Sequence, residues 1–168
     1  MNDLKVAITG GTSGLGLALV REFHRRGARV AFVARTASAV ADVARTHQAH
    51  GIVGDVARKE DIHPIALQIS AALGGLDVLV NNASSLGPTP PALLADTECE
   101  ALELALATNV LGPFRLTKAL LGALAASARE GRGAVVLNIS SDAAITRAPW
   151  RGRARWRRPV HAPRCRAA

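Results

Sequence analysis

The sequence has 168 residues, of which 49% are hydrophobic and 20% charged, and its formal net charge is +8. This composition is typical of a globular domain, and the apolar runs are too short and interrupted for a transmembrane helix. The excess positive charge lies in residues 147–168, which hold eight arginines and no acid, so the 13 basic and 13 acidic residues before them balance.

Short apolar runs alternate with segments of helical periodicity along residues 1–146. We predict strands over residues 5–8, 29–34, 51–54, 77–80 and 134–139. We predict helices from residue 15 to about 27, over 37–46 and over 62–73, and a mostly helical stretch over 97–126 with a break near Gly112 and Pro113. Apolar strands separated by helices favour an α/β fold with a Rossmann-like doubly wound parallel sheet, its strands buried on both faces between two helix layers.

A glycine-rich turn joins the first strand to the first helix, with the sequence Thr9-Gly10-Gly11-Thr12-Ser13-Gly14-Leu15-Gly16. Glycines permit a tight turn and a close approach of the backbone to a pyrophosphate, and the helix N-terminus offers free N–H groups to it. Thr12 and Ser13 could add hydroxyl donors. Taken alone, such a turn is equally explained as a strand-to-helix connection that needs positive φ angles.

The spacing of Gly10, Gly14 and Gly16 resembles the short-chain dehydrogenase/reductase family, and four further motifs resemble it in family order. These motifs are Asp55-Val56, Asn81-Asn82-Ala83-Ser84, Thr108-Asn109-Val110 and Asn138-Ile139-Ser140-Ser141. Ser84 departs from the family's glycine. Each motif alone has a plain structural explanation, such as a helix cap or a turn contact. Their order at successive strand ends favours the family over about residues 4–146.

The resemblance implies a nicotinamide dinucleotide site. Asp55 would accept a hydrogen bond from the adenine amino group, Asn109 would hold a water in a proton relay, and Ser141 would orient a carbonyl or alcohol substrate. The implied cofactor-binding residues are Gly10, Thr12, Ser13, Gly14, Leu15, Gly16, Asp55, Val56, Asn81 and Ala83. The histidines show no metal-ligand spacing, so no metal site is predicted.

The second strand ends Ala34-Arg35-Thr36, where NAD sites usually carry an acid. An arginine there can bind a 2′-phosphate through its guanidinium fork, and no carboxylate repels the phosphate. We therefore predict that Arg35 is a cofactor-binding residue and that NADP is preferred over NAD. The alternative is a solvated loop arginine.

The family's general acid or base is a tyrosine about a dozen residues beyond the serine, with a lysine four positions later. This sequence has no tyrosine, its lysines are Lys5, Lys59 and Lys118, and residues 150–158 stand where the pair is expected. The family's further strands would also follow here, so the fifth strand becomes an edge prone to aggregation. We predict an NADP-dependent oxidoreductase without efficient turnover. The alternative is a non-catalytic dinucleotide-binding protein.

The composition break near Arg147 separates a dinucleotide-binding domain, residues 1–146, from an irregular tail, residues 147–168. One hypothesis is that the tail is an out-of-frame reading of a GC-rich gene, and another frame should then encode Tyr-x-x-x-Lys; the alternative is an ordinary basic tail. Nucleic-acid binding through the tail arginines with Trp150 and Trp156 is the least favoured function.

The Ala- and Leu-rich stretch over residues 97–126 resembles the helices that form a dimer interface in the family, which implies a homo-oligomer. An ordinary buried helix explains the same composition equally well. The first residues lack a basic stretch that leads into an apolar one, so we expect a cytoplasmic protein without a membrane span.

Overall fold

The computed structural model describes residues 3–87 and 93–141. Its centre is a parallel sheet in the order β3-β2-β1-β4-β5. The strands are β1 (Lys5–Thr9), β2 (Arg29–Ala34), β3 (His50–Val53), β4 (Val78–Asn81) and β5 (Val135–Asn138). The helices are α1 (Gly14–Arg25), α2 (Ala37–His47), α3 (Ile62–Leu73), α4 (Cys99–Leu106) and α5 (Gly112–Arg129), with short helical turns η1 (Lys59–Asp61), η2 (Leu94–Asp96) and η3 (Ala107–Leu111). The predicted α/β, Rossmann-like fold is confirmed.

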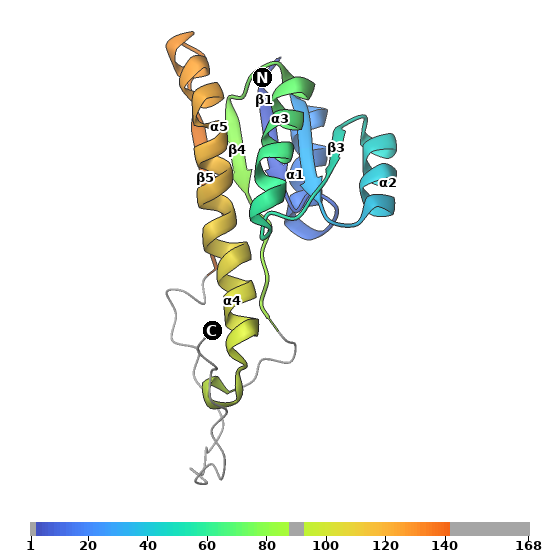
Figure 1. Ribbon diagram of the computed structural model, residues 1–168. Coiled ribbons are helices and arrows are strands. Elements are labelled where there is room, and N and C mark those ends of the chain that lie inside the picture. The colour runs from blue at the N-terminus through green and yellow to red at the C-terminus, as the bar shows by residue number, and fades with distance from the viewer. Residues whose placement is uncertain (1–2, 88–92, 142–168) are drawn as a thin grey trace.

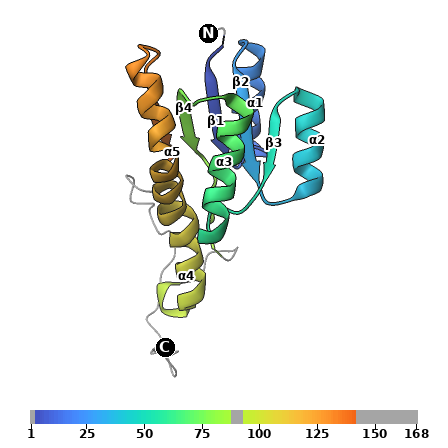
Figure 2. The ribbon, with the colours of Figure 1, turned by 45° about the horizontal axis from the view of Figure 1, so that its top comes forward.

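Alternate residues of the central strands point to opposite faces, and both faces are covered (Figures 1 and 2). Ala7 belongs to a core cluster with residues of α3 and α5, such as Ile69 and Leu120. Val6 and Ile8 belong to a second cluster with Val20 of α1 and Val40 of α2. This double burial explains why β1 and β2 are almost continuously apolar.

The expectation of burial on both faces is wrong for β3, where Ile52 alone is buried, and for β5. All four residues of β5 are exposed, including Val135 at 53% and Leu137 at 46%. The sheet order places β5 at an edge, and among the described elements it packs mainly on β4 and α5, while α1 and α2 cover the face of β1 and β2. The expected exposed edge strand is therefore present, with apolar side chains on it.

The α-helix is interrupted just before Gly112, as predicted, but by a π-helical turn and not by an end of the helical structure. Helical structure continues from Cys99 to Arg129 through the π-helical turn η3, which ends immediately before Gly112. Pro113 lacks an N–H donor and its ring crowds the preceding turn, and a widened turn accommodates such a ring without ending the helix. The described part of the chain contains no helix that is long and apolar enough to cross a membrane.

At the N-terminal edge of the sheet, a buried carboxylate joins β1, β4 and α5. Asp77 is 2% exposed and accepts hydrogen bonds from the Lys5 backbone N–H at 2.8 Å, from the Ser127 hydroxyl, and from the Arg132 guanidinium at 2.7 and 3.1 Å. Burial by itself would raise the pKa of Asp77. The hydrogen bonds from Arg132, Ser127 and Lys5 outweigh that effect and lower the pKa to about 2.

We expect Asp77→Asn to lower the free energy of unfolding at pH 7 by about 2 to 4 kcal/mol, because Arg132 would lose its buried partner. Since the folded-state pKa lies below the ordinary value of 3.8, the wild-type contribution is present above about pH 4 and is lost as the pH falls toward 2. Urea unfolding from pH 7 to pH 2 measures both effects.

Asp42→Asn is the matched control, because Asp42 pairs with Arg45 on the surface and is 70% exposed. It should change the free energy of unfolding by less than about 0.5 kcal/mol. Equal effects of the two substitutions would contradict the role assigned to Asp77.

Candidate functional site

A cavity of about 1460 Å³ lies along the carboxyl ends of the strands. In parallel sheets, loops from these ends converge on one edge, and ligands bind there. The cavity lining includes the predicted residues Gly10, Thr12, Ser13, Gly14, Leu15, Arg35, Asp55, Val56, Asn81, Ala83, Asn109 and Ser141. Of the predicted site residues, Gly16 alone does not line it, because it is buried beneath the turn.

The glycine turn is held by backbone contacts that leave no room for side chains on one side. Gly10 has a φ of 72°, and its N–H donates to the Val33 carbonyl at 2.8 Å. A Cβ on Gly16 would lie 2.1 Å from the Gly10 carbonyl oxygen. The start of α1 can therefore pack this closely against the turn only if residue 16 is a glycine.

The other side of the turn is open. Gly14 has a φ of 52°, and a Cβ there would meet no atom within 4 Å. Ser13 is the N-cap of α1, yet its side chain makes no capping hydrogen bond. The first N–H groups of α1 and the Ser13 hydroxyl thus line a space next to Gly14, and the partial positive charge of a helix N-terminus favours an anion there.

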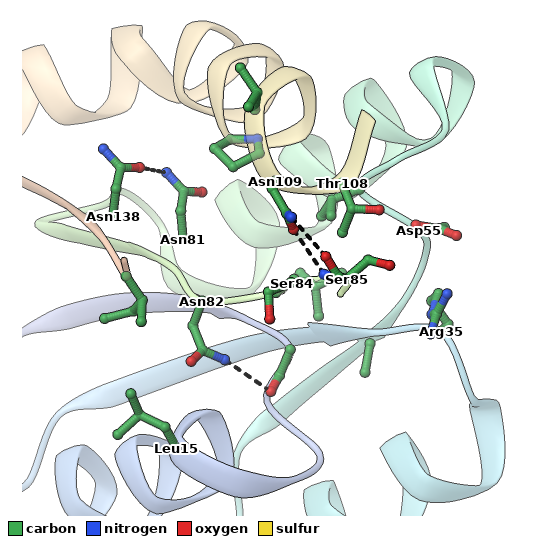
Figure 3. A pocket seen from close by; sticks show the side chains of 18 of the residues that line it. Leu15, Arg35, Asp55, Asn81, Asn82, Ser84, Ser85, Thr108, Asn109 and Asn138 are labelled. Carbon is green, nitrogen blue, oxygen red and sulfur yellow. Dashed lines mark hydrogen bonds between the residues drawn. The ribbon is translucent and has the colours of Figure 1, made fainter. Parts of the chain in front are cut away.

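Thr9 and Asn82 join the glycine turn to the loop that follows β4, and Figure 3 shows Asn82 beside the turn. The Thr9 hydroxyl oxygen accepts from the backbone N–H groups of Asn82 and Ala83, both at 3.0 Å. The Asn82 amide donates to the carbonyls of Thr9 at 2.9 Å and Gly10 at 3.3 Å. Sequence reasoning missed Thr9. The signal was a polar residue ending an apolar strand, because a buried hydroxyl needs a hydrogen-bond partner.

Asn81 couples β4 to β5 and α5 through its side chain. Its amide donates to the Asn138 side-chain oxygen at 2.9 Å and to the Thr117 hydroxyl at 3.3 Å. The Asn81 side-chain oxygen is buried and has no hydrogen-bond partner among the described residues. The cavity is also lined by Thr117, Lys118 and Phe114 of α5, which sequence reasoning missed. These three residues reach the cavity because of the way α5 packs, and no sequence motif marks them.

Asn109 and Ser85 form a reciprocal pair in Figure 3. The Asn109 amide donates to the Ser85 carbonyl at 2.8 Å, and the Ser85 backbone N–H donates to the Asn109 side-chain oxygen at 2.8 Å. One donor and one acceptor of the Asn109 side chain therefore fix the loop after β4 against η3. Ser141, at the end of the described chain, is exposed and lines the same cavity.

Arg35 and Asp55 lie on the same side of the cavity in Figure 3. Arg35 is exposed and makes no side-chain hydrogen bond or ion pair within residues 3–87 and 93–141. One oxygen of the Asp55 carboxylate accepts from the Ala57 N–H at 2.9 Å. No group of three or more His, Cys, Asp or Glu side chains in the described part of the chain could hold a metal ion.

The profile of the short chain dehydrogenase family matches residues 5–153. The chain is 33% identical over 150 residues to the 2-(R)-hydroxypropyl-CoM dehydrogenase of Xanthobacter autotrophicus, with 86% of this chain and 58% of that protein covered. Across the first curated relatives that it matches, the chain spans between 39% and 58% of their length.

Solved structures of short-chain oxidoreductases are also similar to this chain. A metagenomic short-chain oxidoreductase in complex with NADP has a TM-score of 0.73 at 28% identity, with 83% of this chain and 62% of that chain covered. The L-sorbose reductase of Gluconobacter frateurii, complexed with NADPH and L-sorbose, has a TM-score of 0.68 at 29% identity, with 74% and 49% covered.

The steric constraint at Gly16 can be tested with alanine. Gly16→Ala should lower the free energy of unfolding by about 1 to 3 kcal/mol, because the contact with the Gly10 carbonyl outweighs the gain in helix propensity. Gly122→Ala is the control: it lies in α5 with open space around it and should gain up to about 1 kcal/mol. Equal unfolding midpoints in urea for Gly16→Ala and the wild type would contradict the constraint.

Proposed function

The chain belongs to the short-chain dehydrogenase family, and we propose that it binds NADP in the cavity at the carboxyl ends of its strands. The observation that carries the proposal is the exposed guanidinium of Arg35, which has no hydrogen-bond or ion-pair partner among the described residues and lines the same cavity as the open N-terminus of α1. The family is one of oxidoreductases that act on small molecules, and we propose a carbonyl or alcohol as the substrate class.

The pyrophosphate fits the N-terminus of α1. A Cβ built at Gly14 would meet no atom of the other described residues within 4 Å, so this space can take phosphate oxygens next to the free N–H groups of the helix. The Ser13 hydroxyl, which makes no capping bond, is available as a further donor, and Thr12 and Leu15 line the same part of the cavity. Gly16 acts indirectly, by letting α1 approach the turn.

The adenosine half fits between Arg35 and Asp55. The second oxygen of the Asp55 carboxylate makes no hydrogen bond among the described residues, so it can accept from an adenine amino group. Arg35 can bind a 2′-phosphate in a fork, and β2 ends in Ala34 rather than an acid. The NADP and NADPH complexes of two similar structures support this preference over NAD.

At the other end of the cavity, bound nicotinamide would supply hydride chemistry, and Ser141 and Asn109 are the residues proposed to face the substrate. Ser141 would orient the substrate oxygen, and Asn109, already bound to Ser85, would position a water with its remaining donor and acceptor. Neither side chain titrates near neutral pH, and the sequence contains no tyrosine. We therefore propose dinucleotide binding without efficient turnover, and a purely non-catalytic dinucleotide-binding role is the second candidate.

The tail of residues 147–168 lies outside the described residues, so the frameshift hypothesis and the nucleic-acid hypothesis rest on sequence alone. The family match extends to residue 153. A cytoplasmic location also stays a prediction.

Titration of NADPH fluorescence tests cofactor binding. Wild type should bind NADPH more tightly than NADH, and Arg35→Asp should weaken NADPH binding by about 10- to 100-fold, because a charge-assisted fork is replaced by repulsion. Arg45→Asp, at the opposite end of α2, is the matched control and should leave both affinities unchanged. Equal NADPH affinities of wild type and Arg35→Asp would remove Arg35 from the site.

Catalytic turnover can be measured on the same protein samples. With aldehydes and ketones, NADPH oxidation should stay at the uncatalysed rate although the cofactor is bound. Clear turnover by a preparation whose mass matches this sequence would contradict the proposal of impaired catalysis.

We also propose that the chain forms a homo-oligomer through α4, η3 and α5. One side of α5 is buried against the sheet, at Leu116 and Leu120 for example. The exposed apolar side chains on these elements that do not line the cavity are Leu102, Leu104, Leu106 and Leu111. The ordinary buried-helix alternative does not explain these exposed residues, whereas contact with a second copy would cover them.

We expect the double variant Leu102→Glu and Leu106→Glu to shift the protein toward monomer in light scattering after gel filtration, because it places charges in the apolar contact. Leu67→Glu, which is 71% exposed on α3, should leave the mass unchanged. A wild-type monomer at all concentrations would overturn this proposal.

A further inference from the structure

The loop of residues 54–58, here called the Asp55 loop, contains the carboxylate that we propose accepts a hydrogen bond from adenine. The Gly54 N–H donates to the Ala34 carbonyl at 3.0 Å, the Arg58 N–H to the Asp55 carbonyl at 3.1 Å, and the Ala57 N–H to the Asp55 side chain at 2.9 Å. The loop thus turns Asp55 so that one carboxylate oxygen serves the loop and the other is available to the cavity.

Among the described residues, Asp61 is the one residue outside the Asp55 loop whose side chain hydrogen-bonds the backbone of the loop. One oxygen of the Asp61 carboxylate accepts from the Asp55 N–H at 2.9 Å, and the Asp61 N–H donates to the Arg58 carbonyl at 3.2 Å. Asp61 ends η1 and is the N-cap of α3, but its carboxylate makes no capping bond to that helix. Its carboxylate therefore holds the loop rather than the helix.

Packing and charge keep this arrangement in place. A Cβ on Gly112 would lie 2.7 Å from the Val56 carbonyl oxygen, so the start of α5 presses on the loop from a second element. The Arg58 guanidinium lies 3.9 Å from the other Asp61 oxygen and 3.1 Å from a Glu60 carboxylate oxygen. Its positive charge therefore offsets the negative charges of these two carboxylates. The Asp61 side chain is 28% exposed, so solvent competes only partly for its oxygens.

We propose that Asp61 is a positioning residue for the adenosine site: its carboxylate fixes the Asp55 N–H and thereby orients the Asp55 side chain toward adenine. The inference rests on the proposed function, because it assumes that the adenosine half lies between Arg35 and Asp55. Asp61 itself contacts the loop and not the ligand. Its removal therefore affects the adenosine half of the cofactor and leaves the nicotinamide half unchanged.

The test uses the full chain and two half-ligands in calorimetric or NMR titrations, adenosine 2′,5′-bisphosphate and nicotinamide mononucleotide. Asp61→Ala should weaken binding of the bisphosphate about tenfold, as expected for loss of a hydrogen bond to a charged acceptor, with mononucleotide binding unchanged. Asp61→Asn retains an acceptor oxygen and should bind within about threefold of wild type. Glu60→Ala, which shares Arg58 but not the loop contact, is the matched control.

Amide hydrogen exchange adds a readout that does not depend on the ligand. The Asp55 N–H should exchange slowly in wild type and Asp61→Asn, and faster in Asp61→Ala. If Asp61→Ala does not fold, Asp61→Ser replaces it, because the shorter side chain cannot reach the Asp55 N–H.

The outcomes separate the two proposals. If wild type does not bind the bisphosphate, the proposed function fails, and the positioning role fails with it. If wild type binds and the variant without the carboxylate binds equally well, the positioning role alone is overturned. If Asp61→Asn lost as much affinity for the bisphosphate as Asp61→Ala, the effect would be due to charge, and the positioning role would also be overturned.

Discussion

The site depends on how closely the backbone of the glycine turn packs against the start of α1 and the loop after β4. The Gly16 position leaves no room for a Cβ beside the Gly10 carbonyl, and the Asn82 amide binds that carbonyl from the other loop. Thr9 adds two hydrogen bonds to the same loop. These contacts satisfy the inward-facing polar groups of the turn, so that its outward N–H groups remain for a ligand. The shape of the proposed anion site therefore depends on contacts made within the protein.

The two ends of the cavity differ in how completely this chain builds them. At the adenosine end, Arg35 and Asp55 present charged groups, and the loop beneath them is held by Asp61. At the opposite end, β5 is exposed along its whole length, and the Asn81 oxygen is buried without a partner among the described residues. The chain spans about half the length of the relatives that it matches.

The fold was largely predictable because apolar runs and glycines mark the strands and helix ends. The predicted bounds of α3 agree with the structure, since Gly74 ends it in the left-handed region. The continuous α4 to α5 helix was missed because a π-helical turn depends on how Pro113 is accommodated, which no local pattern reveals. The motifs correctly predicted that the site residues meet at one edge of the sheet. The partners of those residues, such as Ser85 for Asn109 and Asp61 for the Asp55 N–H, required coordinates, because a motif does not record which hydrogen bonds are made within the protein.

The residues that we propose bind the pyrophosphate and the adenosine share one further property, which is their early position along the chain. The glycine turn, Arg35, Asp55 and the loop after β4 all precede residue 88, whereas α5 and β5 come later. During synthesis the chain emerges with its N-terminus first, so these residues leave the ribosome before α4, α5 and β5. A nucleotide that binds the early segment favours its native arrangement by mass action. The metabolite pool would then influence how much of the newly made polypeptide matures, independently of any reaction that it supports.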